Sequence, residues 1–370
     1  MAEYDIVVVG SGIAGLSSAH QLADQGRVLV VDRGAVGQGT SSRASGVITT
    51  PVDYPDLPKW ASRAIDSFRE LDGRGVFTFD EQPFIRLVHS PAYAAMVRGR
   101  DDAVMLGPEE SMARFGDVVS SPGAEGVAVY DNVGTCDVSA FLATLKFECE
   151  RRGVDFRPDT TVTGVRVEDG RVVGVDTEYG PIDADDVVVA AGSATPDVVA
   201  EHVELPIRPF TWNAVYLDVD GDVTNWPMGG DTEHQLYWRT MPTGDLLVGR
   251  ENQTFDADPK IDADFERLVD EDLSTFFAFD DFDVVRWETC PIPDATTPDA
   301  RAIIDAPAAA PEGLVVAAGF HGAGVMAGLA IGDIVRSYVT GEAVDLEVEA
   351  FALDRFSDLG RDFPFCSLWD

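Results

Sequence analysis

Three glycines near the N-terminus have the spacing of a dinucleotide-binding loop. The stretch VVVGSGIAGL places Gly10, Gly12 and Gly15 directly after an apolar run. In such a loop the first glycine permits a tight turn, the second lets the backbone approach a pyrophosphate, and the third lets helix and strand pack closely. The N–H groups at the start of the following helix then bind the phosphates. The sequence therefore predicts a dinucleotide site at this loop.

An acidic residue stands where the ribose of such a dinucleotide would lie. Asp32 ends the apolar stretch RVLVVD, 22 residues after Gly10. A carboxylate at this place accepts hydrogen bonds from both ribose hydroxyls, which disfavours the 2′-phosphate of NADP. The loop and the acid together leave NAD and FAD open.

Three further residues are candidates for chemistry on a substrate. Tyr237 and Arg239 alternate in the strand-like stretch LYWRT, so their side chains point to one face. A guanidinium there could bind a carboxylate as a fork, although a surface arginine is the simpler interpretation. His321 lies in a glycine-rich turn, where it either transfers a proton or fills a packing position.

The cysteines favour neither a metal site nor a disulfide framework. Cys136, Cys149, Cys290 and Cys366 are far apart in the sequence and form no CxxC pair. Closely spaced cysteines are the usual mark of both kinds of site. We therefore expect no bound metal.

The elements that position the glycine loop form a βαβ unit. YDIVVV (4–9) is continuous and β-branched, as buried parallel strands are. Residues 13–25 have helical spacing with a stop at Gly26, and RVLVVD (27–32) is a second strand. A crossover of this kind implies a parallel sheet.

The rest of the chain alternates between nucleotide-type and strand-rich segments. A helix over 138–152 and a hairpin around Asp169-Gly170 precede the buried strand VVVAAG, and the chain ends with a strand, a glycine-rich turn and a helix. The fold class is therefore α/β, with a Rossmann-type domain and a discontinuous, strand-rich α+β domain for the substrate. The expected division is 1–75, 138–205 and 291–370 for the first domain, and 76–137 and 206–290 for the second.

The charge balance of the chain is strongly acidic. There are 65 acidic residues against 27 lysines and arginines, which gives a formal net charge of −38. Such a surface repels nucleic acid and anionic lipid, and the composition resembles that of proteins from extreme halophiles, whose salt screens the repulsion. No apolar run approaches the roughly 20 residues needed to span a bilayer, and the N-terminus shows no secretion leader. We therefore expect a cytoplasmic protein without a membrane span.

Four segments together resemble one family of flavin oxidoreductases. They are the N-terminal glycine fingerprint, GTSSRASGVI (39–48), DDVVVAAGSAT (185–195), and TPDARAIID (297–305) followed by GLVVAAGFHGAGVMAGLAIGDIV (313–335). They are similar to segments of the family of D-amino-acid oxidase, glycine oxidase and sarcosine oxidase, with a layout like that of D-arginine dehydrogenase. The fold implied is a Rossmann-type, GR2-like FAD-binding domain with the substrate domain inserted.

The resemblance implies FAD as the cofactor and a set of residues around it. In the C-terminal turn, Gly319, Gly322 and Gly324 would let the backbone lie close to the flat ring, and a helix expected to start near Val325 would direct its positive end at the reduced ring. The residues expected to contact FAD are Gly10, Gly12, Ile13, Ala14, Gly15, Asp32, Arg33, Thr40, Ser41, Ser42, Arg43, Gly46, Val162, Gly192, Gly319, Gly322, Ala323, Gly324, Val325 and Met326.

The family's chemistry implies a substrate that carries an amine. Its members remove a hydride from the carbon that bears the amine, and the resulting imine hydrolyses in water. A tyrosine of the family touches substrate at a position similar to Tyr237. A cysteine near Cys290 anchors the flavin covalently in sarcosine oxidases, but a small core residue is the more common fate of a free cysteine. We therefore favour non-covalent FAD.

The sequence also departs from the family's pattern. No arginine follows the tryptophan of WETC, and Met326, Gly46 and Thr49 stand where sarcosine oxidases carry a lysine and two arginines. Either another arginine binds a substrate carboxylate, or the substrate is not a simple amino acid. The arginines that we consider for this role are Arg208, Arg239, Arg250 and Arg286.

A further departure from the family's pattern bears on the electron acceptor. Sarcosine oxidases use a lysine above the flavin to activate oxygen, and the corresponding stretch GDLLVGRE has none, with Leu247 near that place. We therefore favour a dehydrogenase with an unknown acceptor over an oxidase. Two alternatives stay open: an FAD-dependent 2-hydroxy acid dehydrogenase, and a flavin-binding subunit of a larger oxidoreductase complex. The oligomeric state is not predicted.

Overall fold

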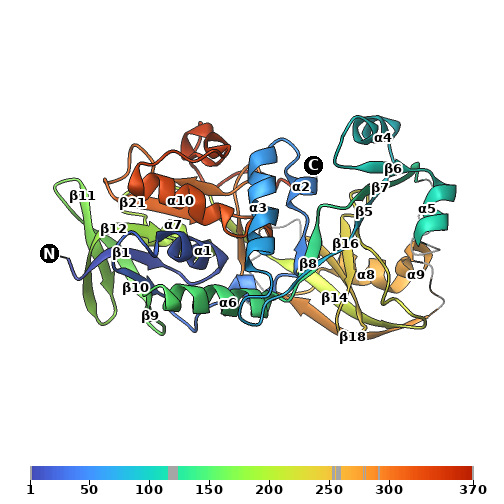
Figure 1. Ribbon diagram of the computed structural model, residues 1–370, viewed down its shortest axis with the longest axis horizontal. Coiled ribbons are helices and arrows are strands. Elements are labelled where there is room, and N and C mark those ends of the chain that lie inside the picture. Colours follow the sequence, from blue (N-terminus) through green and yellow to red (C-terminus); the bar gives the residue numbers. More distant parts are fainter. Residues whose placement is uncertain are drawn as a thin grey trace.

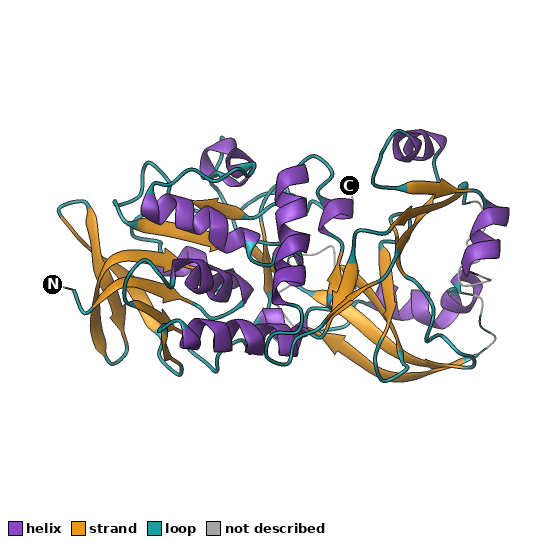
Figure 2. Ribbon diagram, viewed as in Figure 1, coloured by secondary structure: helices purple, strands orange, loops and turns teal. Residues whose placement is uncertain are grey.

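Two large β-sheets lie in the two halves of the molecule, with helix α3 (Pro58–Leu71) and the short strand β8 (Gly134–Cys136) between them (Figure 1). The computed structural model describes residues 2–115, 124–251, 255, 260–277, 279, 281–290 and 292–368. Helices cover the sheet in one half and gather along the outer side of the sheet in the other half (Figure 2).

The first sheet contains the expected parallel strands. Its order is β10-β11-β12-β1-β2-β9, and β21 pairs with both β12 and β20. β1 runs parallel to β2 and β12, and β12 runs parallel to β21. The strands are β1 (Tyr4–Val9), β2 (Val28–Val31), β9 (Asp155–Arg157), β10 (Val162–Glu168), β11 (Arg171–Thr177), β12 (Gly180–Val189), β20 (Ile303–Asp305) and β21 (Leu314–Ala318).

Apolar helix faces bury this sheet. The strand β1 has the fully apolar centre expected of a parallel strand, and Leu16 and Ala19 of the first helix are completely buried against the core. Asp137 caps α6 by accepting a hydrogen bond from the backbone of Ala140, as its place before the apolar stripe indicates. The elements of this half are α1 (Ile13–Leu22), η1 (Thr40–Arg43), α2 (Thr50–Asp53), α3 (Pro58–Leu71), α6 (Val138–Arg151), η2 (Gly192–Ala194), α7 (Thr195–Val198), η3 (Val325–Ala327), α10 (Ala330–Thr340), η4 (Val348–Phe351) and η5 (Leu353–Arg355).

Two expected helix boundaries differ from the structure. The first helix ends at Leu22 rather than at 25, and Gly26 takes a positive φ in the loop beyond it. The C-terminal α-helix does not start near Val325. A short 3₁₀ turn begins there, and Gly328, whose φ is +53°, separates this turn from the α-helix. A Cβ atom at Gly328 would lie 2.1 Å from the hydroxyl of Ser67, so only glycine fits this turn. The helix α10 begins only at Ala330.

The second sheet is the strand-rich part that the sequence predicts. Its order is β18-β14-β17-β16-β15-β5-β7-β6, so it joins strands from two distant stretches of the chain through the parallel pair β15 and β5. Its strands are β5 (Phe84–Val88), β6 (Val104–Leu106), β7 (Gly126–Tyr130), β14 (Trp212–Val219), β15 (Met228–Asp231), β16 (Leu236–Thr240), β17 (Leu246–Glu251) and β18 (Phe282–Thr289). Its helices are α4 (Pro91–Arg98), α5 (Pro108–Phe115), α8 (Ala263–Glu271) and α9 (Leu273–Phe276).

Two small sheets connect the halves. The order of one is β3-β8-β4, and the other pairs β13 with β19. Their strands are β3 (Val47–Ile48), β4 (Phe79–Glu81), β8 (Gly134–Cys136), β13 (Arg208–Phe210) and β19 (Asp294–Thr296).

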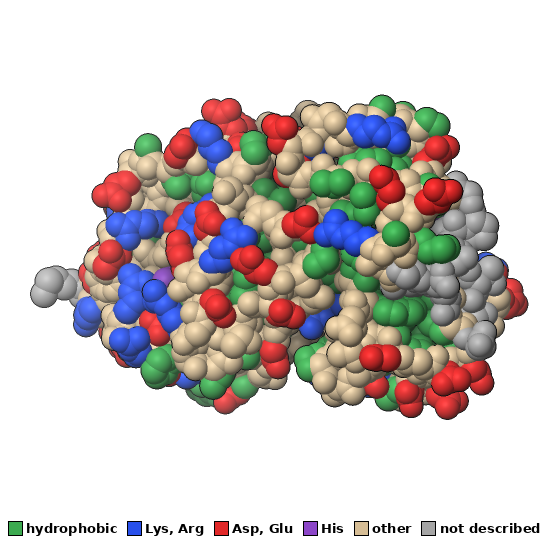
Figure 3. Space-filling view, turned by 45° about the vertical axis from the view of Figure 1, so that its right-hand side comes forward, with side chains coloured by type: hydrophobic (Ala, Val, Ile, Leu, Met, Phe, Trp, Pro, Cys, Tyr) green, Lys and Arg blue, Asp and Glu red, His purple; other side chains and the backbone are tan. Residues whose placement is uncertain are grey.

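The surface has the acidic character of the composition. Figure 3 shows acidic side chains scattered over the visible face, with arginines and lysines between them. Within the described part of the chain, no helix combines the length and the apolar character that a membrane crossing requires.

Candidate active site

One cavity of about 620 Å³ is lined by residues from both large sheets. Its volume lies within the range of about 300–1,000 Å³ that is usual for small-molecule and cofactor sites. Val9 and Val31, at the carboxyl ends of β1 and β2, line one part of it, and Phe84 and Tyr237 of the second sheet line another. The carboxyl edge of a parallel sheet is where ligands of such folds bind.

The glycine loop has no room for side chains. A Cβ atom at Gly10, whose φ is +99°, would lie 2.4 Å from the carbonyl oxygen of Ala190. A Cβ atom at Gly15 would lie 1.9 Å from the carbonyl oxygen of Gly10, so helix α1 can approach β1 only with glycine there. Gly10 and Gly12 line the cavity and Gly15 does not. Gly15 therefore lets the helix and the strand pack closely, as the motif predicts, and its predicted contact with the cofactor stays a prediction.

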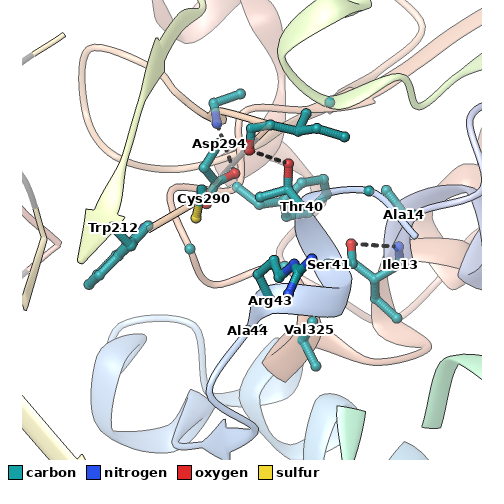
Figure 4. A pocket seen from close by; sticks show the side chains of 18 of the residues that line it. Ile13, Ala14, Thr40, Ser41, Arg43, Ala44, Trp212, Cys290, Asp294 and Val325 are labelled. Carbon is teal, nitrogen blue, oxygen red and sulfur yellow. Dashed lines mark hydrogen bonds between the residues drawn. The ribbon is translucent and has the colours of Figure 1, made fainter. Parts of the chain in front are cut away.

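Hydrogen bonds hold the loop and its neighbours in place. The Ser41 hydroxyl accepts a hydrogen bond from the backbone N–H of Ile13 at 3.0 Å, at the start of α1 (Figure 4). Asp32 accepts hydrogen bonds from the backbone N–H and the hydroxyl of Ser11, both at 2.6 Å, and from the N–H of Gly34 at 2.9 Å. The carboxylate therefore sits fixed at the end of β2, where it lines the cavity.

The C-terminal turn forms a further part of the cavity wall. Gly319, Gly322 and Gly324 line it. A Cβ atom at Gly322, whose φ is +80°, would lie 2.5 Å from the ring of Trp212. The bare backbone at Gly322 therefore lets this turn lie directly against the indole. The N–H of Leu329, directly before α10, donates to the Ser67 hydroxyl at 3.1 Å.

Most of the predicted FAD-contact residues line the same cavity. Those that do are Gly10, Gly12, Ile13, Ala14, Asp32, Arg33, Thr40, Ser41, Arg43, Gly46, Val162, Gly192, Gly319, Gly322, Gly324, Val325 and Met326. Ser42 and Ala323 do not. The Ser42 hydroxyl donates to the carbonyl of Gly39 at 2.8 Å, and Ala323 is buried in the core.

Tyr237 lies in the cavity as a predicted substrate residue should. Its ring lies over Gly249, where a Cβ atom would approach Cζ to 2.1 Å, and it packs edge-to-face on Trp212 at 6.0 Å. Burial raises the pKa of Tyr237 above its usual value, so the hydroxyl stays protonated and can donate a hydrogen bond at neutral pH.

Arg239 is buried rather than on the surface, and it lies outside the cavity lining. Its side chain is 4% exposed and its Nη1 donates to the carbonyl oxygens of Ser45 at 2.9 Å, Gly46 at 3.1 Å and Cys136 at 3.2 Å. The side chain points to the same face as Tyr237, as the alternation predicts, but carbonyl groups already occupy it and it does not line the cavity. Arg239 is a positioning residue for the loop that carries Gly46.

His321 lies in the core outside the cavity lining. Its ring is fully buried and stacks on Phe210 at 4.6 Å, and it does not line the cavity. Nδ1 lies 2.6 Å from the hydroxyl of Thr296, and Nε2 lies 3.0 Å from the carboxylate of Glu251. Both ring nitrogens therefore have buried partners, and the structure gives the ring no contact with the cavity.

Cys290 lines the cavity beside Asp294 and Thr40 (Figure 4). Burial raises the pKa of the Cys290 thiol to about 11, and burial also raises the pKa of Asp294. The neutral thiol is a weak nucleophile. Cys290 therefore lies where a bound cofactor could reach it. Its thiol is protonated at neutral pH, which disfavours a covalent bond.

The sequence analysis missed a buried arginine in the cavity. Arg86 of β5 donates from Nη2 to the Asp53 carboxylate at 2.9 Å, and both residues line the cavity. Burial is the largest single influence and lowers the pKa of Arg86, but Asp53, Tyr93 and Tyr130 together outweigh it and the pKa is raised. The signal in the sequence was a single charge inside the apolar strand FIRLV.

None of the four arginines considered for the carboxylate lines the cavity. Arg208 lies 3.5 Å from the ring centre of Phe255, and Arg286 lies 3.7 Å from the ring centre of Tyr216. Arg239 is occupied by carbonyl groups, and Arg250 is absent from the lining. Trp212 was also missed, because no pattern marks an aromatic residue at the start of a strand as a cavity residue.

The residues present fit an FAD molecule. The side-chain-free loop and the start of α1 suit a pyrophosphate, and Asp32 at the end of β2 suits a ribose. The second glycine-rich turn, with Gly322 and Trp212 in contact, supplies a backbone surface that a flat ring can approach. The cavity joins these parts without interruption.

Comparisons with known proteins point to the same cofactor. The chain is 27% identical to glycine oxidase of Pseudomonas putida over 283 residues, which are 70% of this chain and 74% of that protein. It is 24% identical to 4-methylaminobutanoate oxidase (formaldehyde-forming) of Paenarthrobacter nicotinovorans, over 95% of this chain but 45% of that protein.

Solved structures share the fold. The crystal structure of L-proline dehydrogenase from P. horikoshii superimposes with a TM-score of 0.86 at 20% identity, over 96% of this chain and 98% of that one. Glycine oxidase from Geobacillus kaustophilus gives a TM-score of 0.80 at 18% identity, over 97% of this chain and all of that one. The family model for FAD dependent oxidoreductases (DAO) matches residues 5–337, and the chain therefore belongs to this FAD-dependent family.

Proposed function

We propose that this protein oxidises an amine or amino acid by removing a hydride from the carbon that bears the nitrogen. The observation that carries the proposal is the single cavity that joins the glycine loop to the aromatic wall of Trp212 and Tyr237. When bound, FAD supplies the acceptor for the hydride. The names of the relatives, which are amine and amino-acid oxidases and dehydrogenases, support the same reaction class.

The chain's own residues would bind and orient the donor. The Trp212 and Tyr237 rings are large apolar surfaces that exclude water from one side of the cavity. The protonated Tyr237 hydroxyl can donate a hydrogen bond to an acceptor atom of the substrate. The carbon loses its hydrogen with two electrons, the nitrogen loses a proton, and the resulting imine reacts with water to give an oxo compound and an amine or ammonia.

A product analysis tests this proposal. The holoenzyme in molar salt is supplied with an artificial electron-accepting dye and with amino acids, N-methylated amines or hydroxy acids. We expect dye reduction with one class of amine donor, and one oxo product and one ammonia or amine for each two-electron equivalent. Turnover of hydroxy acids alone would replace the proposal by a 2-hydroxy acid dehydrogenase. No turnover, together with copurifying proteins, would favour a flavin-binding subunit.

The electron acceptor is proposed to be a compound other than oxygen. Among the described residues that line the cavity there is no lysine, and Leu247 is buried outside it. We expect the reduced enzyme to be reoxidised slowly by air and rapidly by the dye, as measured by the return of the flavin absorbance in a stopped-flow experiment. Reoxidation by air at the rate of the dye would contradict a dehydrogenase.

A cytoplasmic location belongs to the same proposal. Cys136, Cys149 and Cys290 are buried and form no disulfide bonds among the described residues. Reduced cysteines are the rule in the cytosol.

A further inference from the structure

Four aspartates line the cavity: Asp32, Asp53, Asp231 and Asp294. The first lies at the end of β2, where the ribose is expected. Asp53 lies 2.9 Å from a nitrogen of Arg86, and the two carboxylate oxygens of Asp231 lie 2.8 Å and 2.5 Å from histidine nitrogens. Within the described part of the chain, Asp294 forms no salt bridge with a lysine, arginine or histidine. Its charge is therefore left without a cationic partner.

The carboxyl of Asp294 belongs to the aromatic wall of the cavity. Asp294 begins β19, where it pairs with Phe210 of β13, and Trp212 follows two residues later at the start of β14. Cys290 lies beside Asp294 (Figure 4), and Tyr237 packs edge-to-face on the Trp212 ring. Asp294 therefore shares a wall with the two rings that are proposed to bind the donor.

Neutral N–H groups hold this carboxyl in place. Its Oδ1 accepts a hydrogen bond from the backbone N–H of Ala295 at 2.8 Å. Burial raises the pKa of Asp294, and it outweighs the N–H groups of Ala295, Gly322 and Trp212 and the nearby His321, which lower the pKa. Neutral donors fix the position of a carboxylate without cancelling its charge. The ionised form therefore presents a negative charge to the cavity.

A protonated amine is the group that complements such a carboxylate. Aliphatic amines are cations at neutral pH, and a cation is also attracted by the face of an aromatic ring. The nitrogen has to give up a proton before the neighbouring carbon can lose a hydride, because its lone pair must stabilise the positive charge that develops on the carbon. A carboxylate whose pKa lies above its usual value is a stronger base for this proton.

We infer that Asp294 accepts the proton that the donor nitrogen loses, and that the donor enters the cavity as a protonated amine. The inference rests on the proposed amine oxidation and adds a catalytic base to it. An N–H bond of the ammonium group breaks and the O–H bond of the carboxyl forms, so the positive and the negative charge disappear together. The neutral amine then loses its hydride as proposed above, and the carboxyl returns its proton to water after the product has left.

Ligand binding to the holoenzyme tests the charge of Asp294 without turnover. The probes are n-propylamine, n-butylamine and benzylamine, each compared with the alcohol of the same carbon skeleton, and the change of the flavin absorbance spectrum reports binding. We expect at least one amine to bind about 10- to 100-fold more tightly than its alcohol, and Asp294→Asn to abolish this preference. Asp294→Glu, which keeps the carboxylate but moves it, is expected to retain part of the preference.

The pH dependence of flavin reduction separates a base from a residue with a structural role. The second-order rate constant for reduction by an amine is measured anaerobically in a stopped-flow experiment. In the wild type we expect it to be level between the pKa of Asp294 and that of the amine, and to fall at lower pH, because a protonated carboxyl accepts no proton. Asp294→Asn requires the neutral amine from solution, so its rate constant is expected to rise about tenfold per pH unit up to the pKa of the amine.

Controls exclude the other titratable groups near this carboxyl. Burial raises the pKa of the Cys290 thiol to about 11 and also raises the pKa of Tyr237, so both stay protonated where the rate constant falls. His321→Gln removes the neighbouring imidazole and is expected to keep the fall at low pH. Asp218→Asn removes an exposed carboxylate of β14 and is expected to show the wild-type preference and profile.

The outcomes separate this inference from the proposed function. Amines that bind no more tightly than their alcohols in all three pairs would overturn the inference, and this result needs no variant. An Asp294→Asn enzyme with the pH profile of the wild type would overturn it as well, while its reduction by an amine would leave the proposed function standing. A wild type that prefers amines through Asp294 but is reduced by no amine would keep the cation site and lose the proposed function.

Discussion

Gly12 is a residue whose missing side chain decides whether a cofactor fits. A Cβ atom there would lie 3.1 Å from the hydroxyl of Ser41, the group that accepts the hydrogen bond from Ile13. Any larger side chain therefore meets both the loop and the space for the pyrophosphate. The same principle holds at Gly322, against the ring of Trp212.

Gly12→Val is expected to abolish FAD binding without unfolding the chain. The valine would fill the space for the pyrophosphate and push Ser41 away from α1. The FAD content of the purified protein measures the effect, with circular dichroism as the check of folding. Gly164→Val is the matched control, because nothing lies within 4 Å of a Cβ atom at Gly164. A normal FAD content in Gly12→Val would contradict this account of the loop.

FAD is expected to leave the protein on denaturation. Burial raises the pKa of the Cys290 thiol to about 11, so at neutral pH almost none of it is the thiolate that a covalent bond requires. Acid precipitation followed by absorbance of the supernatant measures the released flavin. If the flavin stays in the wild-type pellet but is released from the Cys290→Ser pellet, the flavin is bound covalently at Cys290, contrary to this prediction.

Single residues differ in how far the sequence predicts them. The contacts at Gly10, Gly12 and Asp32 follow from a motif whose parts are close together in the chain. Arg86 could not be found this way, because its place in the cavity wall depends on the pairing of β5 with β15, two strands from distant segments. The structure places His321 and Arg239 outside the cavity lining, and residue type and strand alternation do not reveal the buried carbonyl and carboxylate groups that they contact.

At the scale of elements, a strand of the second sheet fixes a loop at the cavity wall. Arg239 on β16 donates to carbonyl groups of Ser45, Gly46 and Cys136, and the N–H of Cys136 donates to Gly46 at 3.0 Å. The loop before β3, the strand β8 and the second sheet therefore meet at one guanidinium. This contact explains why a buried charge is present away from the cavity.

Arg239→Met is expected to lower the free energy of unfolding by about 2–4 kcal/mol, since three buried carbonyl groups lose a donor. The loop that carries Gly46 would loosen, so FAD affinity is expected to fall as well. Urea denaturation in molar salt measures the first effect and FAD titration the second. Arg267→Met, on the exposed face of α8, is the control. Equal midpoints for Arg239→Met and the wild type would contradict the positioning role.

Elements were predicted well where the local pattern is complete. The strands β1 and β2 and the helix α6 follow from apolar periodicity and a capping residue, and the structure contains them. The start of α10 was wrong, because the need for glycine at position 328 comes from the approach of Ser67 on α3, which no local pattern contains.

At the scale of the whole molecule, the main feature is the net charge of −38. The acidic side chains are spread over the surface (Figure 3), so their repulsion acts on the folded state as a whole. At 1 M salt the screening length is about 3 Å, and at 0.1 M it is about 10 Å. The division into two domains at the boundaries given above stays a prediction at this scale.

Stability is therefore expected to rise with salt. The melting temperature of the holoenzyme should increase by several degrees between 0.1 M and 1 M KCl, mostly over the lower concentrations where screening changes fastest. Differential scanning calorimetry measures it, and sucrose at equal osmolality is the control for solute exclusion. A melting temperature that is independent of salt, or equally raised by sucrose, would contradict the role of charge repulsion.

The most direct test of amine oxidation is the anaerobic absorbance of the holoenzyme in molar salt. Donors are added in pairs that share a carbon skeleton, with an amino or N-methylamino group in one and a hydroxyl group in the other. We predict that the flavin absorption band bleaches with the amine of one such pair and stays unchanged with its hydroxy counterpart. Bleaching by the hydroxy acids alone would contradict amine oxidation as the function of this cavity.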